Sequence, residues 1–208
     1  MAGLPLYKQK RSTWSDYLTW AEGERWEIVD GEVFDMSPTP LSRHQWVADR
    51  LHSRLVDFFE GKRCRLWFAP MAVKLSEEDV VEPDLFAVCN PRQIKRTHIE
   101  GPPALVIEIL SESSYRHDRV TKRRLYERHG VKEYWIIQPH PALIEVNVLR
   151  NGKYELHGGY EKHETLRSPT FRGLRLPLKG VFDFPLEPGE EVQMVRESTP
   201  PYATRRRR

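Results

Sequence analysis

The segment from Pro103 to Tyr134 constrains the fold of this chain more than any other. It begins with an apolar stretch over residues 103–110, continues through a polar turn and a helix, and ends in a second apolar strand that begins at Glu133. Apolar residues occupy both alternating faces of the first stretch, which is typical of a central strand buried on both sides. Glu108 is the one charged residue within it.

A carboxylate in such a strand needs a partner. An ionised Glu108 is costly to bury unless a cation, a metal or strong hydrogen-bond donors contact it. The helix that follows presents Asp118, Lys122 and Tyr126 at four-residue spacing, and this spacing places all three on one helix face. Much of the remaining helix surface is basic, with arginines at positions 116, 119, 123, 124 and 128, where a phosphate backbone would find partners.

A second carboxylate in apolar surroundings is predicted near the N-terminus. The dipeptide Asp30-Gly31 between two apolar-rich runs indicates a hairpin with a two-residue loop. Such a loop pairs Val29 with Glu32 and Glu27 with Phe34, so these four side chains share one face. Glu27 then lies beside apolar neighbours, and Glu32 competes with it for the same role.

The other elements follow from periodicity and turn signals. Pro83-Asp84 stands at the head of a strand, where proline is tolerated because it cannot donate to the ladder further in. The resulting order is a mixed α/β sandwich rather than a regular βαβ repeat, with an added C-terminal β-rich extension that buries one side of the core. Helices are expected over residues 13–22 and 44–60, and strands over 64–68, 71–75, 80–89, 143–149, 154–157 and 166–178.

The length of the chain and its charge distribution predict one domain whose folded part is nearly neutral. We expect a single domain over residues 1–200 and a disordered, solvated basic tail over 201–208. The formal net charge of +3 falls to −1 without the four arginines 205–208, so overall charge does not argue for nucleic-acid binding. Cys64 and Cys89 are expected to form neither a disulfide framework nor a metal knuckle. No apolar run approaches the ~20 residues needed to cross a bilayer, which excludes a membrane protein and favours the cytoplasm.

The charged residues together indicate a type of chemistry. Asp84 and Glu108 fall on strands that can be neighbours, and paired carboxylates suit a hard cation such as Mg²⁺. Lys122 beside them could orient or deprotonate a water and stabilise developing negative charge. A metal, carboxylates and an ammonium suit phosphodiester hydrolysis.

Simpler interpretations stay open on the residues alone. Lys122 and Asp118 could form a surface ion pair on the helix. Glu108 could pair with a buried arginine, and Asp84 could be a turn residue at a strand start. Glu27 could be purely structural, and residues His44 and Tyr126 could serve packing.

The motifs, in their order, resemble a known family. They are Trp26–Glu32, Ser42–Gln45, Pro83-Asp84, Val106–Ser111, Asp118 with Lys122 and Tyr126, and Gly130–Trp135. Over roughly residues 13–185 the chain resembles the Uma-type restriction-endonuclease-like family of the PD-(D/E)XK nuclease superfamily. Two positions depart from the family pattern, Glu112 where proline is common and Gln138 where aspartate is common, and both lie outside the predicted metal shell.

The resemblance implies a restriction-endonuclease-like mixed sheet flanked by helices, and a role for each matching residue. Asp84 and Glu108 would bind the metal, and Glu27 would supplement that site. The superfamily lysine often stands two residues after the acid, where this chain has Leu110, and Lys122 on the next helix would replace it. Asp118, Tyr126 and His44 would support the site.

The expected function is therefore a metal-dependent endonuclease that uses Mg²⁺ or Mn²⁺ and acts on DNA. A non-catalytic nucleic-acid- or protein-binding module that retains the nuclease fold is the alternative. A phosphodiesterase acting on RNA or a smaller substrate would use the same site. A homodimer is plausible because cutting a duplex needs two sites.

Overall fold

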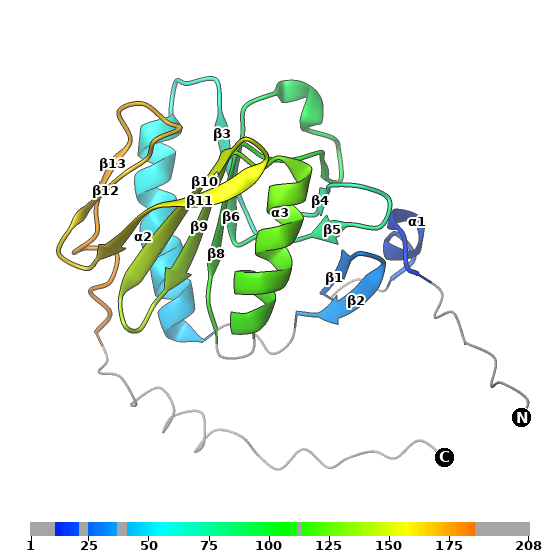
Figure 1. The fold of residues 1–208 in the computed structure, drawn as a ribbon, viewed down its shortest axis with the longest axis horizontal. Coiled ribbons are helices and arrows are strands. Elements are labelled where there is room, and N and C mark those ends of the chain that lie inside the picture. The colour runs from blue at the N-terminus through cyan, green and yellow to red at the C-terminus, as the bar shows by residue number, and fades with distance from the viewer. Residues whose placement is uncertain (1–10, 21–24, 37–40, 112–113, 186–208) are drawn as a thin grey trace, which may run out of the picture.

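A six-stranded mixed sheet forms the centre of the fold in the computed structural model, which describes residues 11–20, 25–36, 41–111 and 114–185 (Figure 1). Its strand order is β11-β10-β9-β8-β6-β3. The strands are β3 (Arg65–Phe68), β6 (Leu85–Val88), β8 (Leu105–Ile109), β9 (Glu133–Gln138), β10 (Leu143–Arg150) and β11 (Lys153–Glu161). The predicted basic tail, residues 201–208, lies outside the described residues.

Different elements cover the two faces of this sheet. The long helix α2 (Ser42–Phe59) buries Val47, Leu51 and Leu55 on one face, together with the ribbon β12 (Thr165–Arg167) and β13 (Arg175–Pro177). The other face is covered by a π-helix (His117–Lys122) that continues into α3 (Arg123–His129), as Figure 1 shows for α3. A second sheet packs on that side in the order β2-β1-β5-β4-β7. Its strands are β1 (Trp26–Val29), β2 (Glu32–Asp35), β4 (Val73–Lys74), β5 (Val80–Val81) and β7 (Ile99–Glu100).

Several predicted elements are confirmed. β8 is an interior strand whose five residues are all buried, and it carries Glu108 as expected. The β1–β2 hairpin has the predicted register, with Glu27 opposite Phe34 and Val29 opposite Glu32. α2 spans nearly the predicted range, and β6 begins directly after Pro83-Asp84.

Other boundaries differ from the predictions. The helix expected over 13–22 forms only α1 (Trp14–Tyr17), capped by Thr13, and residues 21–24 lie outside the described part. The strand expected over 80–89 divides into β5 and β6, which belong to different sheets because Pro83 interrupts the ladder. The C-terminal β-structure also has two parts: β10 and β11 extend the central sheet, and only the segment with β12 and β13 covers a face.

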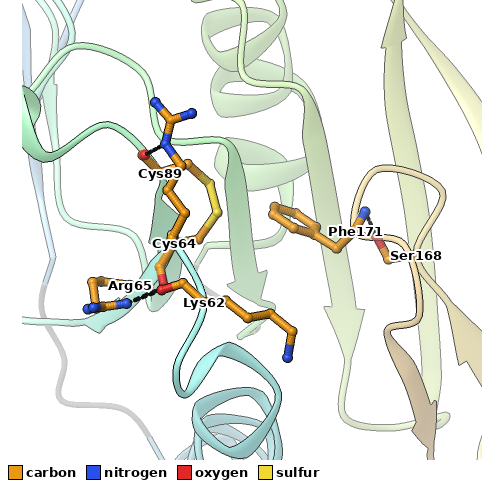
Figure 2. Close-up of a disulfide and its surroundings, with 7 residues drawn as sticks. Lys62, Cys64, Arg65, Cys89, Ser168 and Phe171 are labelled. Atoms are coloured by element: carbon orange, nitrogen blue, oxygen red, sulfur yellow. Dashed lines mark hydrogen bonds between the residues drawn. A yellow bond between two sulfur atoms is a disulfide. The ribbon is translucent and has the colours of Figure 1, made fainter.

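The prediction for the cysteines was wrong. Cys64 and Cys89 are joined by a disulfide, with Cα atoms 3.9 Å apart (Figure 2). They flank β3 and β6, which pair antiparallel with Arg65 opposite Val88, so the register brings the two cysteines face to face. The two cysteines are 25 residues apart in the sequence, so no local pattern indicates that they lie opposite each other on paired strands.

Because disulfides persist mainly in oxidising surroundings, the disulfide lends no support to the expected cytoplasmic location. Cytoplasmic location therefore stays a prediction. Across the described ranges, no helix is both long enough and apolar enough to cross a bilayer.

Asp79 connects three parts of the fold. It lies between β4 and β5, and its carboxylate accepts hydrogen bonds from the Asp30 backbone N–H at 2.8 Å and from Arg128 at 3.1 and 3.2 Å. The ring of His129 contacts it at 2.8 Å. Burial opposes the charge on Asp79, but these partners lower the pKa of its carboxyl far below the ordinary value. The β1–β2 hairpin and the end of α3 are thereby tied to one carboxylate.

Replacing Asp79 by alanine should lower the free energy of unfolding by about 1–3 kcal/mol, because buried donors lose their acceptor. Since the pKa of Asp79 is lowered on folding, its contribution is fully present above the unfolded-state pKa of ~3.9 and is lost progressively as the pH falls from there through the lower folded-state pKa. Urea unfolding of both proteins at pH 7 and at pH 3 measures this. An undiminished difference at pH 3 would contradict the assignment.

Candidate active site

The strand pairing places two acidic residues opposite each other. β6 and β8 run antiparallel with Leu85 opposite Ile107, so one further step in this register sets Asp84 against Glu108. The backbone N–H of Ile109 donates to Oδ2 of Asp84 at 2.8 Å and fixes that carboxylate beside the strand. The predicted pairing of Asp84 and Glu108 on neighbouring strands is confirmed.

The helix between β8 and β9 brings a lysine over the same spot. These two strands are parallel, so the connecting helix packs back onto the sheet. Its first part, His117–Lys122, is a π-helix rather than the α-helix that the four-residue spacing predicted. The hydroxyl of Tyr134 on β9 donates to the backbone oxygen of Asp118 at 3.1 Å and anchors this turn. Wider turns of this kind are frequent at functional sites.

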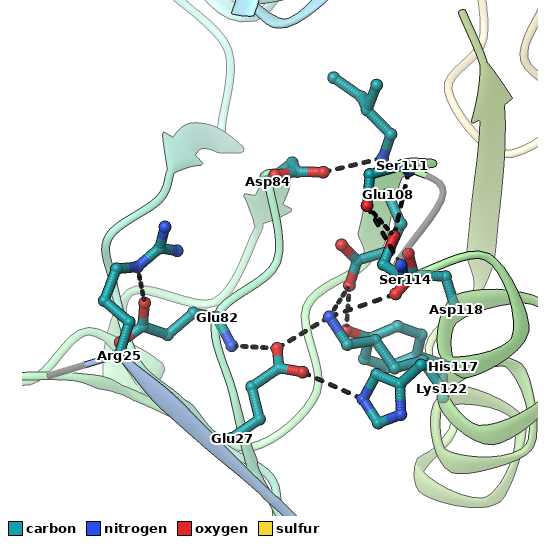
Figure 3. Close-up of polar contacts among 12 residues, drawn as sticks. Arg25, Glu27, Glu82, Asp84, Glu108, Ser111, Ser114, His117, Asp118 and Lys122 are labelled. Carbon is teal, nitrogen blue, oxygen red and sulfur yellow. Dashed lines mark hydrogen bonds and ion pairs between the residues drawn. The ribbon is translucent and has the colours of Figure 1, made fainter. Parts of the chain in front are cut away.

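Lys122 is the centre of the resulting cluster (Figure 3). Its Nζ lies 2.8 Å from Oε1 of Glu27, 3.1 Å from Oε1 of Glu108 and 3.5 Å from Oδ1 of Asp118. Its side chain is only 2% exposed. Burial opposes the charge on Lys122, but the surrounding carboxylates raise its pKa well above the ordinary value. Lys122 is thus a buried cation within 3.5 Å of three carboxylates.

Glu27 belongs to the cluster and Glu32 does not. Glu27 is fully buried, accepts the backbone N–H of Glu82 at 2.9 Å and contacts Nε2 of His117 at 3.2 Å. Burial raises the pKa of Glu27, but Lys122, His117 and the Glu82 N–H together lower it to about 2. Glu32 is exposed on β2, outside the cluster. Of the two candidates, the structure therefore brings only Glu27 to the lysine.

The pKa of Glu108 is shifted upward, in the opposite direction to that of Glu27. The hydroxyl of Tyr126 donates to Oε1 of Glu108 at 2.6 Å, the same oxygen that Lys122 contacts. Burial, reinforced by the charges of Asp118, Asp84 and Glu27, nevertheless raises the pKa of Glu108 well above its ordinary value. Burial likewise raises the pKa of Asp118. One lysine does not compensate all of these carboxylates.

His44 supports Asp84 from α2. Its Nε2 lies 3.2 Å from Oδ2 of Asp84. Burial lowers the pKa of His44, but the hydrogen bond and charge of Asp84 outweigh burial, so the net shift is upward. Because Nδ1 of the ring is buried and without a hydrogen-bond partner among the described residues, the neutral ring carries its proton on Nε2, toward Asp84.

The donor set fits a hard divalent cation. Among the described residues, Asp84 forms its hydrogen bonds and ion pairs through Oδ2 and Glu108 forms them through Oε1. The second oxygen of each carboxyl group has no such contact to these residues. Among the described side chains no three His, Cys, Asp or Glu converge in a metal-ligating arrangement. A pair of carboxylates is nevertheless what Mg²⁺ needs, because it keeps several waters and takes further ligands from substrate phosphates. The uncompensated negative charge also favours a cation here.

Sequence reasoning missed His117 as a member of this site. On a regular α-helix its side chain would point about 100° away from that of Asp118. The π-helix turns it toward the cluster, where it contacts Glu27 and its ring lies 4.3 Å from that of Phe34. Predicting the position of His117 would have required predicting the π-helix, and we recognise no signal for a π-helix in the sequence.

The basic helix surface is less available than expected. Arg119 pairs with Glu145 at 3.0 Å, and Arg123 donates to the backbone oxygen of Tyr154 at 3.1 Å. Arg128 pairs with Asp30 and Asp79. Three of the five arginines thus contact groups of the protein itself, which weakens the expectation of a phosphate-binding face there.

Comparison with known proteins agrees with this architecture. A crystal structure of a "putative nuclease belonging to DUF820" from Anabaena variabilis ATCC 29413 resembles the chain with a TM-score of 0.67 at 18% identity, over 82% of this chain and 97% of that one. This likeness confirms the restriction-endonuclease-like fold.

Of two sequence comparisons, the match to a family model identifies the family. "Uncharacterized protein slr1290" from Synechocystis sp. (strain ATCC 27184 / PCC 6803 / Kazusa) is 27% identical over 125 residues, which cover 59% of this chain and 65% of that relative, just under two thirds of its length. The model of the Uma2 family, described as "Putative restriction endonuclease", matches residues 14–179. Because this match covers most of the chain, the chain belongs to the Uma2 family.

Proposed function

We propose that this protein is a metal-dependent endonuclease that hydrolyses phosphodiester bonds in DNA, with Mg²⁺ or Mn²⁺ held by Asp84 and Glu108. The observation that carries the proposal is the cluster around Lys122, in which carboxylates outnumber the lysine and one oxygen of each candidate ligand has no hydrogen bond or ion pair to the residues that the structure describes. Membership of a family described as "Putative restriction endonuclease" supports the reaction class.

Each residue of the cluster would have a separate task. A bound divalent cation would supply Lewis-acid chemistry at the phosphate and a more acidic water. Lys122 would act as a fixed charge rather than as a base, because its raised pKa keeps it protonated. Glu27 would hold Lys122 in place, and Tyr126 would hold Glu108. The backbone N–H of Ile109 would hold Asp84. His44 would orient Asp84.

The test is cleavage of plasmid DNA with Mg²⁺ or Mn²⁺. Asp84→Asn should slow cleavage by about 100-fold or more, because it removes a ligand charge from the metal site. Asp57→Asn is the matched control, since Asp57 is an exposed aspartate on α2. Equal rates for the parent and Asp84→Asn would contradict the proposal.

Two further outcomes are informative. Binding of DNA without metal uptake or cleavage would favour the alternative, a non-catalytic module that retains the fold. Cleavage of RNA or of small phosphodiesters, with DNA left intact, would change the proposed substrate but not the proposed site. We also propose that the protein forms a homodimer, and light scattering with and without DNA tests this.

A further inference from the structure

Asp84 is the more accessible of the two candidate metal ligands. The side chains of Glu27, Glu108 and Lys122 are 0%, 3% and 2% exposed, whereas that of Asp84 is 20% exposed. A cavity of ≈ 370 Å³ opens at Asp84, and its walls include residues of α2, the end of β3 and Arg25. A substrate that reaches Asp84 through this cavity contacts these walls.

One wall of this cavity is an exposed aromatic ring. Phe68, the last residue of the edge strand β3, is 57% exposed. The ring of His52 on α2 meets it edge-on, with centroids 4.8 Å apart and planes at 76°. His52 thus supports Phe68 from the side. An exposed ring at the entrance to a site for nucleic acid can serve as a stacking surface for a base.

Beside apolar residues such as Ala48 and Leu85, the cavity has polar groups that suit a sugar-phosphate chain. Nε of Arg25 pairs with Glu82 at 3.1 Å, and Tyr17 donates to the other oxygen of Glu82 at 2.8 Å. Figure 3 shows the guanidinium of Arg25 held by Glu82 through this one nitrogen. Arg25 stays 34% exposed, so its planar group is positioned before a phosphate arrives. Gln45, an exposed residue in the first turn of α2, adds an amide.

We propose that this cavity binds one unstacked nucleotide of the substrate, with its base against Phe68 and its phosphate toward Arg25. The proposal rests on the proposed function and narrows its substrate class. A volume of ≈ 370 Å³ lies at the small end of the range for small-molecule sites, which suits a single nucleotide rather than a double helix. A base inside a duplex is stacked on both faces and offers none to Phe68. The preferred substrate is therefore single-stranded or locally unpaired DNA.

The test is binding of fluorescent oligonucleotides by anisotropy, with Ca²⁺ in place of Mg²⁺ to limit cleavage. Three probes of equal length are compared: oligothymidylate, an abasic oligomer that keeps the phosphates but lacks bases, and an intact duplex. The parent should bind oligothymidylate about 5- to 100-fold more tightly than the abasic oligomer, because stacking requires a base. It should also bind the single strand more tightly than the duplex.

Variants at position 68 separate stacking from simple apolar contact. Phe68→Ala and Phe68→Leu should lose the preference for bases, and Phe68→Trp should keep it. Leu156→Ala is the matched control, because Leu156 is 63% exposed on β11, at the opposite edge of the same sheet. Thermal unfolding of each variant verifies the fold.

The results distinguish this inference from the proposed function. Metal-dependent cleavage together with an unchanged base preference in Phe68→Ala would overturn the nucleotide pocket and leave the nuclease intact. Tighter binding of the duplex than of the single strand by the parent would also overturn it. A Phe68-dependent preference for bases without any cleavage would support the pocket and count against the nuclease.

Discussion

Replacing Lys122 by methionine is expected to lower the free energy of unfolding by about 3–5 kcal/mol in metal-free buffer, because it leaves buried carboxylates without their cation. Methionine has a similar length and fits an apolar environment, so the lost charge and not a cavity dominates the effect. Lys122 is within 3.5 Å of Glu27, Glu108 and Asp118, and all four side chains are buried. Urea unfolding followed by circular dichroism measures the loss.

Lys153→Met is the matched control. Lys153 also pairs with a glutamate, Glu127, at 3.0 Å, but its side chain is 81% exposed. Removing an exposed pair should cost less than about 1 kcal/mol. A loss of the same small size for Lys122→Met would show that Lys122 does not compensate the buried charge.

Replacing Glu108 by glutamine is expected to leave the metal-free protein almost as stable as the parent while removing its response to Mg²⁺. The amide has the shape of the carboxyl group, and burial raises the pKa of Glu108, which shifts this group toward its neutral form. Lys122 and Tyr126 can still donate to the remaining oxygen. The amide supplies no charge to a dication, however.

Thermal unfolding with and without Mg²⁺ measures this difference. At a metal concentration a hundredfold above Kd, the parent should gain ~2.7 kcal/mol of stability. Glu108→Gln should gain none, and Glu32→Gln should gain as much as the parent because Glu32 is exposed on β2. The full Mg²⁺-dependent gain in stability in Glu108→Gln would show that the metal binds elsewhere.

Much of the candidate site could be predicted from the sequence because its parts lie in short, regular elements. The Asp30-Gly31 turn determines the hairpin register, and that register places Glu27 correctly. Glu108 was recognisable as a charge in an otherwise apolar strand. Lys122 lies at 3.1 Å from Glu108, in agreement with the prediction that the lysine comes from the helix. The role of each residue in catalysis stays a proposal.

The remainder depended on contacts between distant segments. The disulfide follows from the pairing of β3 with β6, which no local pattern reveals. The π-helix changes which side chains face the sheet, so His117 enters the site although the α-helical spacing excluded it. The cavity at Phe68 needs α2, β3 and Arg25 together. Local propensity is uninformative about such long-range arrangements.

Diffraction from crystals of the parent protein grown with Mn²⁺ would locate the proposed metal independently of activity, because manganese gives an anomalous signal. One strong anomalous peak per chain is expected between the carboxyl groups of Asp84 and Glu108. A peak at any other place, or none at saturating Mn²⁺, would contradict the assignment of these two residues as metal ligands.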